Sequence, residues 1–343
     1  MFLNTELFGH QRGASNKGYK KIKYGTMVLS TQNLHLGNAN VNQRFEHGMV
    51  SPAYKTYDIT GCYVDLIAQW IKSDAAKRFF YNATTVGASV CRRNVEWDTL
   101  YEQSLYLPCR DEQEKVAKFL GLLSNRINKQ QQFVSALKKY KRGLLNKVFS
   151  NINGNIYPTV YLSEVADFLQ GLTYSPSDVS VAGYLVLRSS NIQNGVLSFD
   201  DCVYVDKKVD ESLQVKCDDV IMCVRNGSKK LVGKTALIPN NMAMTTWGAF
   251  MMIIRSKLND TYIFHYLNSQ MFFSQVFKDT GTATINQITK GILNECKLPL
   301  PPETARKQIS KMLSSFDVKI QNAEMCLTTL VELKKALLQQ LFI

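Results

Sequence analysis

The sequence feature that most constrains the fold of this chain is an internal repeat, in which the last residues have a counterpart in the middle of the chain. Residues 140–149 read YKRGLLNKVF, residues 333–342 read LKKALLQQLF, and the two copies align without a gap for more than forty residues at a constant offset of 193. A repeat of this length predicts two copies of one structural unit. The 343 residues are enough for two domains that each bury a core.

Each copy of the repeat predicts one long helix. Apolar residues advance by four and three positions in turn, a heptad pattern that lasts for about five heptads. Such a stripe could also pack each helix into its own domain, but the length of the helices and the domain-sized insert between them favour a coiled coil. The expected seam residues are Val116, Leu120, Leu123, Ile127 and Leu137 in the first copy, and Ile309, Leu313, Phe316, Ile320 and Leu330 in the second.

The two seams also contain an equivalent pair of lysines, Lys141 and Lys334. In a parallel, in-register pair of helices these charges would face each other at a buried position, which is costly. We therefore expect the two helices to run antiparallel.

The repeat divides the chain into four parts. We expect a first domain over 1–107, a first helix over 108–150, a second domain over 155–300 and a second helix over 301–343.

Local patterns within the two domains indicate an α/β fold, a curved sheet with helices. Strand-like alternation occurs in 183–199, and a helical pattern follows in 261–277. Asp111 and Thr304 occupy equivalent positions after a proline and are the expected N-caps of the two long helices.

The chain is strongly basic, with a formal net charge of +13 and a pI of 9.3. This charge indicates a polyanionic partner, most commonly nucleic acid. The alternative is that the charge serves only to keep the protein soluble. The eight cysteines are scattered without metal-ligand spacing, so we expect reduced thiols in a cytoplasmic protein and no metal site. No apolar run is long enough to cross a membrane, so no membrane partner is expected.

No motif in the sequence predicts an active site. The segment GSKKLVGKT (227–235) resembles a phosphate-binding loop, but five residues separate its glycines where four are needed. The residues that follow read as a strand, whereas such a loop opens a helix. We interpret 225–230 as a basic turn between strands and expect a chain that is not an enzyme. An enzyme with an unrecognised site is the alternative.

Polar and basic loops are the expected sites of contact with double-stranded DNA. Basic and hydroxyl side chains bind phosphates, while arginine and asparagine pair with guanine and adenine in the major groove. For any one of these residues, a structural or solvated turn is the simpler interpretation. The expected contact residues are Arg188, Asn191, Arg225, Asn226, Ser228, Lys229, Lys230, Thr245, Thr246 and Thr282 in the second domain, and Gln32, Asn33, His35, Arg92 and Arg93 in the first.

Four stretches together resemble the DNA specificity subunits of type I restriction–modification systems. The resemblance covers nearly the whole chain and implies two target-recognition domains, each followed by a long helix. The stretches are LVLRSSNIQNGVLSFDDCVYV (185–205), the segment 15–54, TGTATINQITKGILNECKLPLPP (280–302), and the paired helices that follow a proline and end in LLxxxF.

The resemblance also implies a function and a set of partners. The chain would read a bipartite DNA site, one half with each domain, and direct a partner adenine methyltransferase to it. It would bind two methyltransferase subunits and, through them, a restriction subunit that acts as nuclease and translocase. S-adenosylmethionine, ATP and Mg would belong to these partners, and this chain would hold no cofactor.

The first domain departs from the family pattern at its front. By the repeat, its counterpart of the residues near Asn155 would lie about 38 positions before Met1. Either another chain supplies this part, or the first domain is impaired. A truncated scaffold or decoy that binds methyltransferase without reading DNA is therefore the alternative function.

Overall fold

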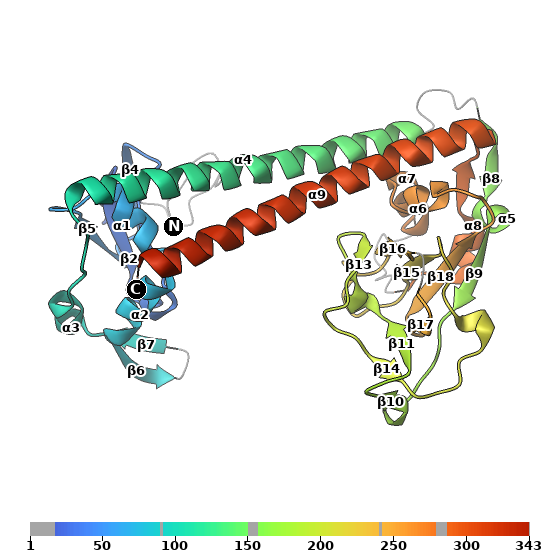
Figure 1. Ribbon diagram of the computed structural model, residues 1–343, viewed down its shortest axis with the longest axis horizontal. Helices are drawn as coiled ribbons and strands as arrows, with labels where there is room; N and C mark the ends of the chain where they lie inside the picture. Colours follow the sequence, from blue (N-terminus) through green and yellow to red (C-terminus); the bar gives the residue numbers. More distant parts are fainter. Residues whose placement is uncertain (1–17, 90–91, 150–156, 240–241, 279–286, 343) are drawn as a thin grey trace. The chain divides into compact units, whose positions relative to one another are not determined.

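The computed structural model describes residues 18–89, 92–149, 157–239, 242–278 and 287–342 (Figure 1). The chain divides into two compact units. The first unit contains Met1–Val134 and Ala323–Ile343, and the second contains Ser135–Asn322. Two long helices, α4 (Arg110–Phe149) and α9 (Glu303–Leu341), contribute residues to both units.

The helices α4 and α9 pair antiparallel (Figure 1). Within the first unit, Lys334 donates a hydrogen bond to Ser124, and six positions further along α4 Gln130 donates to the carbonyl oxygen of Ala323. Moving toward the C-terminus along α4 therefore means moving toward the N-terminus along α9. The antiparallel coiled coil predicted from the two seam lysines is confirmed.

The residues of the heptad stripe lie along the contact between the helices. One face of each helix remains in water, so burial recurs at every third or fourth position. Leu120, Ile127, Leu313 and Ile320 are buried, and Val116, Leu123, Leu137, Ile309, Phe316 and Leu330 are half-buried.

The starts of the helices differ from the expected ones. Asp111 and Thr304 lie inside the first turns of α4 and α9, so their prediction as N-caps is wrong. The start of α4 is held by Gln113, whose Nε2 donates to the carbonyl oxygen of Pro108 at 2.9 Å. The Oε1 of Gln113 accepts from the backbone N–H of Tyr63 at 2.8 Å, which ties the helix to the globular part of the first unit.

The first unit is built on a three-stranded antiparallel sheet with the order β3 (Ala39–Val41), β2 (Thr26–Ser30) and β5 (Tyr54–Asp58). Two helices, α1 (Val64–Trp70) and α2 (Asp74–Asn82), share one apolar core with this sheet. Ser73 accepts a hydrogen bond from the N–H of Ala76 and so begins α2. The buried residues of this core include Leu29, Leu34, Ile67, Trp70 and Phe80.

Smaller elements complete the first unit. They are the ladder of β1 (Lys20–Lys23) with β4 (His47–Val50), the short 3-10 helix η1 (Leu34–Leu36), the hairpin of β6 (Thr84–Ser89) with β7 (Arg92–Val95), and α3 (Trp97–Glu102).

The second unit contains two four-stranded sheets. The first has the antiparallel order β16 (Thr235–Leu237), β15 (Val220–Cys223), β18 (Met251–Ser256) and β9 (Ala166–Gln170). In the second sheet, β11 and β17 are parallel, and its order is β10 (Val179–Ser180), β14 (Tyr204–Val205), β11 (Tyr184–Leu187) and β17 (Thr245–Trp247).

The helices and short ladders of the second unit pack around these sheets. A large core joins the first sheet to α5, α6, α7 and α8 and to the ends of α4 and α9. The remaining elements are α5 (Leu162–Val165), α6 (Tyr262–Leu267), α7 (Gln270–Val276), α8 (Lys290–Glu295), the 3-10 helices η3 (Pro176–Asp178), η4 (Ser189–Asn191) and η5 (Glu211–Leu213), and the ladders β8 (Thr159–Tyr161) with β19 (Lys297–Pro299) and β12 (Ile192–Gln193) with β13 (Val196–Leu197).

The sheets of the two units correspond strand by strand. Met27 of β2 pairs with Tyr57, and Val220, which stands at the repeat offset from Met27, pairs with Ile254 of β18. The order β3-β2-β5 therefore matches β16-β15-β18, and β9 is an additional strand of the second unit. These features confirm the α/β class with two repeated domains and two long helices. In the part of the chain that the structure describes, no helix combines the length and apolar character needed to cross a membrane.

Candidate nucleic-acid interface

The basic segment 225–230 is a turn that connects β15 to β16, as the sequence predicts. These two strands pair antiparallel, and the residues after the turn form a strand, so the segment is not a phosphate-binding loop. The backbone N–H of Ser228 donates to Oδ1 of Asn226 at 2.9 Å and closes the turn. Arg225, Ser228, Lys229 and Lys230 are exposed.

Contacts from neighbouring loops hold the base of this turn. The guanidinium of Arg225 lies over the ring of Phe250, 5.4 Å from its centroid. Nδ2 of Asn226 donates to Oγ of Ser189 at 3.1 Å. Neither Phe250 nor Ser189 carries a sequence signal, because each acquires its role only when distant loops meet.

Arg188 contacts an acid of its own domain. Its Nη2 lies 2.8 Å from Oδ1 of Asp201, and the arginine side chain is one-third exposed. The Nε of Arg188 is buried without a hydrogen-bond partner among the described residues. The ion pair occupies one nitrogen of the guanidinium, so Arg188 is only partly available to another acceptor.

Three of the residues expected to contact DNA are buried in the folded chain. Asn191 is fully buried. Its Oδ1 accepts from the N–H of Arg188, and its Nδ2 donates to the carbonyl oxygens of Ser198 and Asp201. Thr245 and Thr246 belong to β17, which pairs with β11, and are 3% and 0% exposed. All three residues organise the fold behind the surface.

The expected loop of the first unit forms the turn around η1. Leu34 is fully buried and fixes this turn to the core, while Gln32 is exposed and Asn33 and His35 are half-buried. The turn ends at Gly37, whose φ of 77° is a left-handed conformation that glycine adopts without strain.

Arg93 has a structural role in the first unit. Its Nε donates to Oγ1 of Thr84 at 2.8 Å, its Nη2 donates to the carbonyl oxygen of Thr84 at 2.6 Å, and its guanidinium lies over the ring of Tyr81. These contacts join β7 to β6. The side chain of Arg92 and the whole of Thr282 lie outside the described residues.

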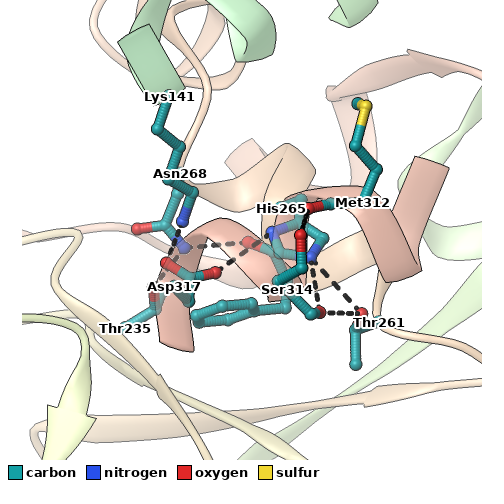
Figure 2. Close-up of polar contacts among 10 residues, drawn as sticks. Lys141, Thr235, Thr261, His265, Asn268, Met312, Ser314 and Asp317 are labelled. Carbon is teal, nitrogen blue, oxygen red and sulfur yellow. Dashed lines mark hydrogen bonds and ion pairs between the residues drawn. The ribbon is translucent and has the colours of Figure 1, made fainter. Parts of the chain in front are cut away.

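A buried polar cluster joins α4, α6 and α9 within the second unit (Figure 2). Nε2 of His265 lies 3.1 Å from Oγ of Ser314 and 3.4 Å from Oγ1 of Thr261. On the other side of the ring, Nδ1 of His265 lies 3.9 Å from Oδ2 of Asp317, whose Oδ1 is paired with the ammonium of Lys141.

This cluster contains a serine, a histidine and an aspartate, the residue types of a catalytic triad. Its geometry, however, indicates a structural role. His265 is fully buried, and burial lowers its pKa to about 3, with the charge of Lys141 contributing in the same direction. A separation of 3.9 Å is too long for a hydrogen bond from the imidazole to Asp317. The imidazole is therefore neutral and holds α6 to α9. The sequence carries no sign of the cluster because its members come from three separate helices.

The first unit has a counterpart of this cluster with different charges. Ser124 stands at the repeat position of Asp317, and Lys334 stands at that of Lys141. Nζ of Lys334 donates to Oγ of Ser124 at 2.6 Å. Burial lowers the pKa of Lys334, and the charge of Lys72 lowers it further.

Within the described ranges, no group of three or more His, Cys, Asp or Glu side chains is arranged to hold a metal ion. Burial raises the pKa of the Cys296 thiol to about 11, so this cysteine is a core residue and not a reactive thiolate.

Residues 157–330 match the family model described as "Type I restriction modification DNA specificity domain". The chain is 26% identical over 190 residues to the StySPI specificity subunit of Salmonella potsdam, a match that covers 52% of this chain and 40% of that protein. It is 26% identical over 174 residues to the EcoKI specificity subunit of Escherichia coli strain K12, covering 48% of this chain and 36% of that one. The matched segments thus span less than half of either relative.

A similar fold occurs in a solved S subunit of a type I restriction–modification system from M. genitalium. The TM-score is 0.60 at 14% identity, and the match covers 96% of this chain and 87% of that one. At this identity the likeness concerns the fold.

Proposed function

This chain belongs to the family of type I restriction–modification DNA specificity subunits, and from this premise we propose that it selects the DNA site at which a partner adenine methyltransferase acts. The observation that carries the proposal is the exposed turn 225–230 within the matched domain. Its two lysines supply charge for phosphates, and the guanidinium of Arg225 lies over the ring of Phe250 beside them. Phosphate contacts fix the register of a protein on DNA, and an arginine beside them can read a guanine edge.

The site read by this chain would have two parts. The repeated sheet and the repeated helices support one reading surface per unit, and the first unit offers Gln32, Asn33 and His35 on the η1 turn. The net charge of +13 suits a partner with many phosphates. Each half of the DNA site would then be read by a different set of side chains.

The long helices would hold two copies of the methyltransferase. Exposed apolar residues recur at the same repeat position on both helices: Phe119 corresponds to Met312, and Tyr140 corresponds to Leu333. Each unit thus carries one such residue from each helix. A partner that recognises this arrangement in one unit finds it again in the other, which supports two copies.

Catalysis would take place in the partners. S-adenosylmethionine would belong to the methyltransferase, and ATP and Mg to a restriction subunit with nuclease and translocase activity. The adenine that is to be methylated must leave the duplex to reach the active site. The subunit that reads the sequence therefore has to be coupled mechanically to the methyltransferase.

The test is a map of methylated adenines in cells that express this chain with its methyltransferase partner. A split motif with two defined halves is the expected result. A motif defined on one side alone would contradict reading by the first unit. A complex that forms normally but methylates no defined motif would overturn the proposal.

A further inference from the structure

A short hairpin, formed by β12 and β13, lies beside the basic turn 225–230 in the second unit. Both of its strands pack against β16, the strand that follows this turn (Figure 1). Nδ2 of Asn226, in the turn, donates to Oγ of Ser189 at 3.1 Å. Ser189 belongs to η4, which leads directly into β12. The hairpin and the basic turn are therefore joined at their bases.

The two residues at the tip of the hairpin have a left-handed backbone conformation. The φ angle is 53° at Asn194 and 81° at Gly195. Two such residues between paired strands form a tight turn whose twist matches that of the strands, and Asn-Gly is its favoured sequence. At the base of the hairpin, the N–H of Ser198 donates to the carbonyl oxygen of Asn191 at 2.9 Å. Local sequence and backbone contacts thus favour one conformation of the tip.

The hairpin has a buried face and an exposed face. Its two cross-strand pairs are Ile192 with Leu197 and Gln193 with Val196. Ile192 is 1% exposed, and together with Leu197 it packs into the core that contains Trp247. Side chains alternate between the two faces of a strand, so Gln193 and Val196 point away from this core. Both are exposed, and the outer face therefore presents a carboxamide beside two methyl groups.

The tips of the hairpin and of the turn both have free space around them. A Cβ built on Gly195 or on Gly227 would lie more than 4 Å from every described residue other than the neighbours in the chain. The hairpin residues 192–197 carry no charge, whereas the turn 225–230 carries an arginine and two lysines. The turn therefore suits phosphates, and the hairpin suits a neutral partner that forms hydrogen bonds.

A carboxamide beside methyl groups matches the major-groove edge of an adenine–thymine pair. Glutamine and asparagine bind N6 and N7 of adenine with both ends of the amide, and apolar side chains contact the thymine methyl group. The major groove is wide enough to admit a two-stranded β-ribbon. Phosphate contacts position a protein on DNA, and contacts with base edges specify the sequence. The turn and the hairpin supply these two kinds of contact side by side.

We propose that the tip of the β12–β13 hairpin enters the major groove and reads an adenine–thymine pair in the half-site of the second unit. This inference rests on the proposed function, DNA site selection. The amide of Gln193 bonds to the adenine, and Val196 contacts the thymine methyl group. Asn194 offers a second amide at the turn.

The experiment uses the complex of the full chain with its methyltransferase partner. The variant combines Gln193→Met, which keeps the length of the side chain without its amide, with Asn194→Gly, which tolerates the positive φ. The control is Asn259→Gly, which removes an exposed amide beyond the end of β18 that lies away from the turn. Maps of methylated adenines should show that the variant discriminates about tenfold less at one adenine–thymine position of one half-site. The control should read the parent motif.

Binding titrations separate base reading from phosphate contact. The variant changes no charge, so it should bind the parent motif about tenfold more weakly with an unchanged slope of log affinity against log salt. Replacing the adenine at the affected position by 7-deazaadenine removes the N7 acceptor. This replacement should weaken binding by the parent chain severalfold and leave binding by the variant unchanged. Gln193→Met alone keeps the Asn-Gly turn and provides the same test if the double variant fails to fold.

Two outcomes would overturn this inference while the proposed function stands. One is a variant that reads the parent motif with full discrimination, which would make the tip a solvated turn. The other is equal sensitivity of parent and variant to 7-deazaadenine, which would assign the adenine to another side chain. A parent complex that methylates no defined motif would instead overturn the proposed function, and this inference with it.

Discussion

Nε2 of Gln130 donates a hydrogen bond of 2.9 Å to the carbonyl oxygen of Ala323, the residue that stands 193 positions later at its own repeat position. Two equivalent helices that pair antiparallel have one place where a residue meets its counterpart. Here that place carries a hydrogen bond from a polar side chain, and a polar side chain in a seam helps to specify the pairing register. Every other seam contact then occurs twice in one molecule, once in each unit.

The two seam lysines should respond differently to the same substitution. Lys141→Met leaves the carboxylate of Asp317 without its ammonium partner beside the neutral His265, so we expect a loss of about 2 kcal/mol in the free energy of unfolding. Lys334→Met should be neutral or stabilising. It removes a partly buried charge that is close to Lys72, and the hydroxyl of Ser124 still donates to the carbonyl of Leu120.

Urea unfolding of both variants at neutral pH and one salt concentration measures this difference. Because the two positions are equivalent in the repeat, each variant serves as the control of the other. An equal loss in both would mean that the cost at Lys141 does not come from its pairing with Asp317.

The stability of the second unit should fall as the pH falls through the weakly acidic range. The pKa of His265 is about 3 in the fold, against 6.5 for an exposed imidazole, so the unfolded chain takes up the proton first. The stabilisation is complete above pH 6.5 and is lost as the pH falls toward 3. The slope from this residue is at most about 1.4 kcal/mol per pH unit.

His265→Gln tests this assignment because glutamine can bond to Ser314 but does not titrate. Chemical unfolding at several pH values between 7 and 4 should show a shallower pH dependence in the variant than in the parent chain. If the two curves stay parallel, another group causes the acid sensitivity.

Asn191→Ala should destabilise the second unit without changing the DNA sequence that is read. The change removes three hydrogen bonds at a fully buried position, for which we expect a loss of about 2–3 kcal/mol. Thermal unfolding measures the loss, and the map of methylated adenines measures the motif. Unchanged stability together with a new motif would return Asn191 to the role of a base reader.

Changing Arg225 and Lys229 together to alanine should weaken DNA binding and flatten its salt dependence. Each lost phosphate contact lowers the slope of log affinity against log salt by roughly 0.9, so the loss of Lys229 should lower it by about 0.9, while the loss of Arg225 should weaken binding through its contact with a base edge. Titrations of the complex with DNA at several salt concentrations give the slope. Lys311→Ala, an exposed lysine on α9, is the matched control. An unchanged slope in the double variant would remove this turn from the interface.

The helices and their direction could be predicted because they depend on local periodicity. Apolar residues spaced four and three positions apart in turn define the seam. The charges of Lys141 and Lys334 make the parallel arrangement costly. The helix starts were less predictable. A glutamine side chain, Gln113, holds the beginning of α4 through contacts with Pro108 and Tyr63, and no local capping pattern reveals such contacts.

The exposure of the expected contact residues could be predicted only in part, because residue type does not reveal burial. Arg225 and Lys229 lie in a turn between paired strands, and the sequence shows that turn. Thr246 has the same polar character, yet β17 enters a sheet whose neighbour β11 comes from a distant part of the chain. A pocket of about 380 Å³ beside β5 was likewise invisible, because side chains of β2, α1, α2 and α3, which are separate in the sequence, line it together.

The edge of β5 also bears on how this protein has to be produced and handled. Unpaired backbone groups on a strand edge accept any extended chain, including a second molecule of the same protein in a concentrated solution. Lys55 and Asp58 place charges on this strand and oppose such pairing in part. Preparations in which this edge is exposed should therefore lose material to aggregation as concentration rises.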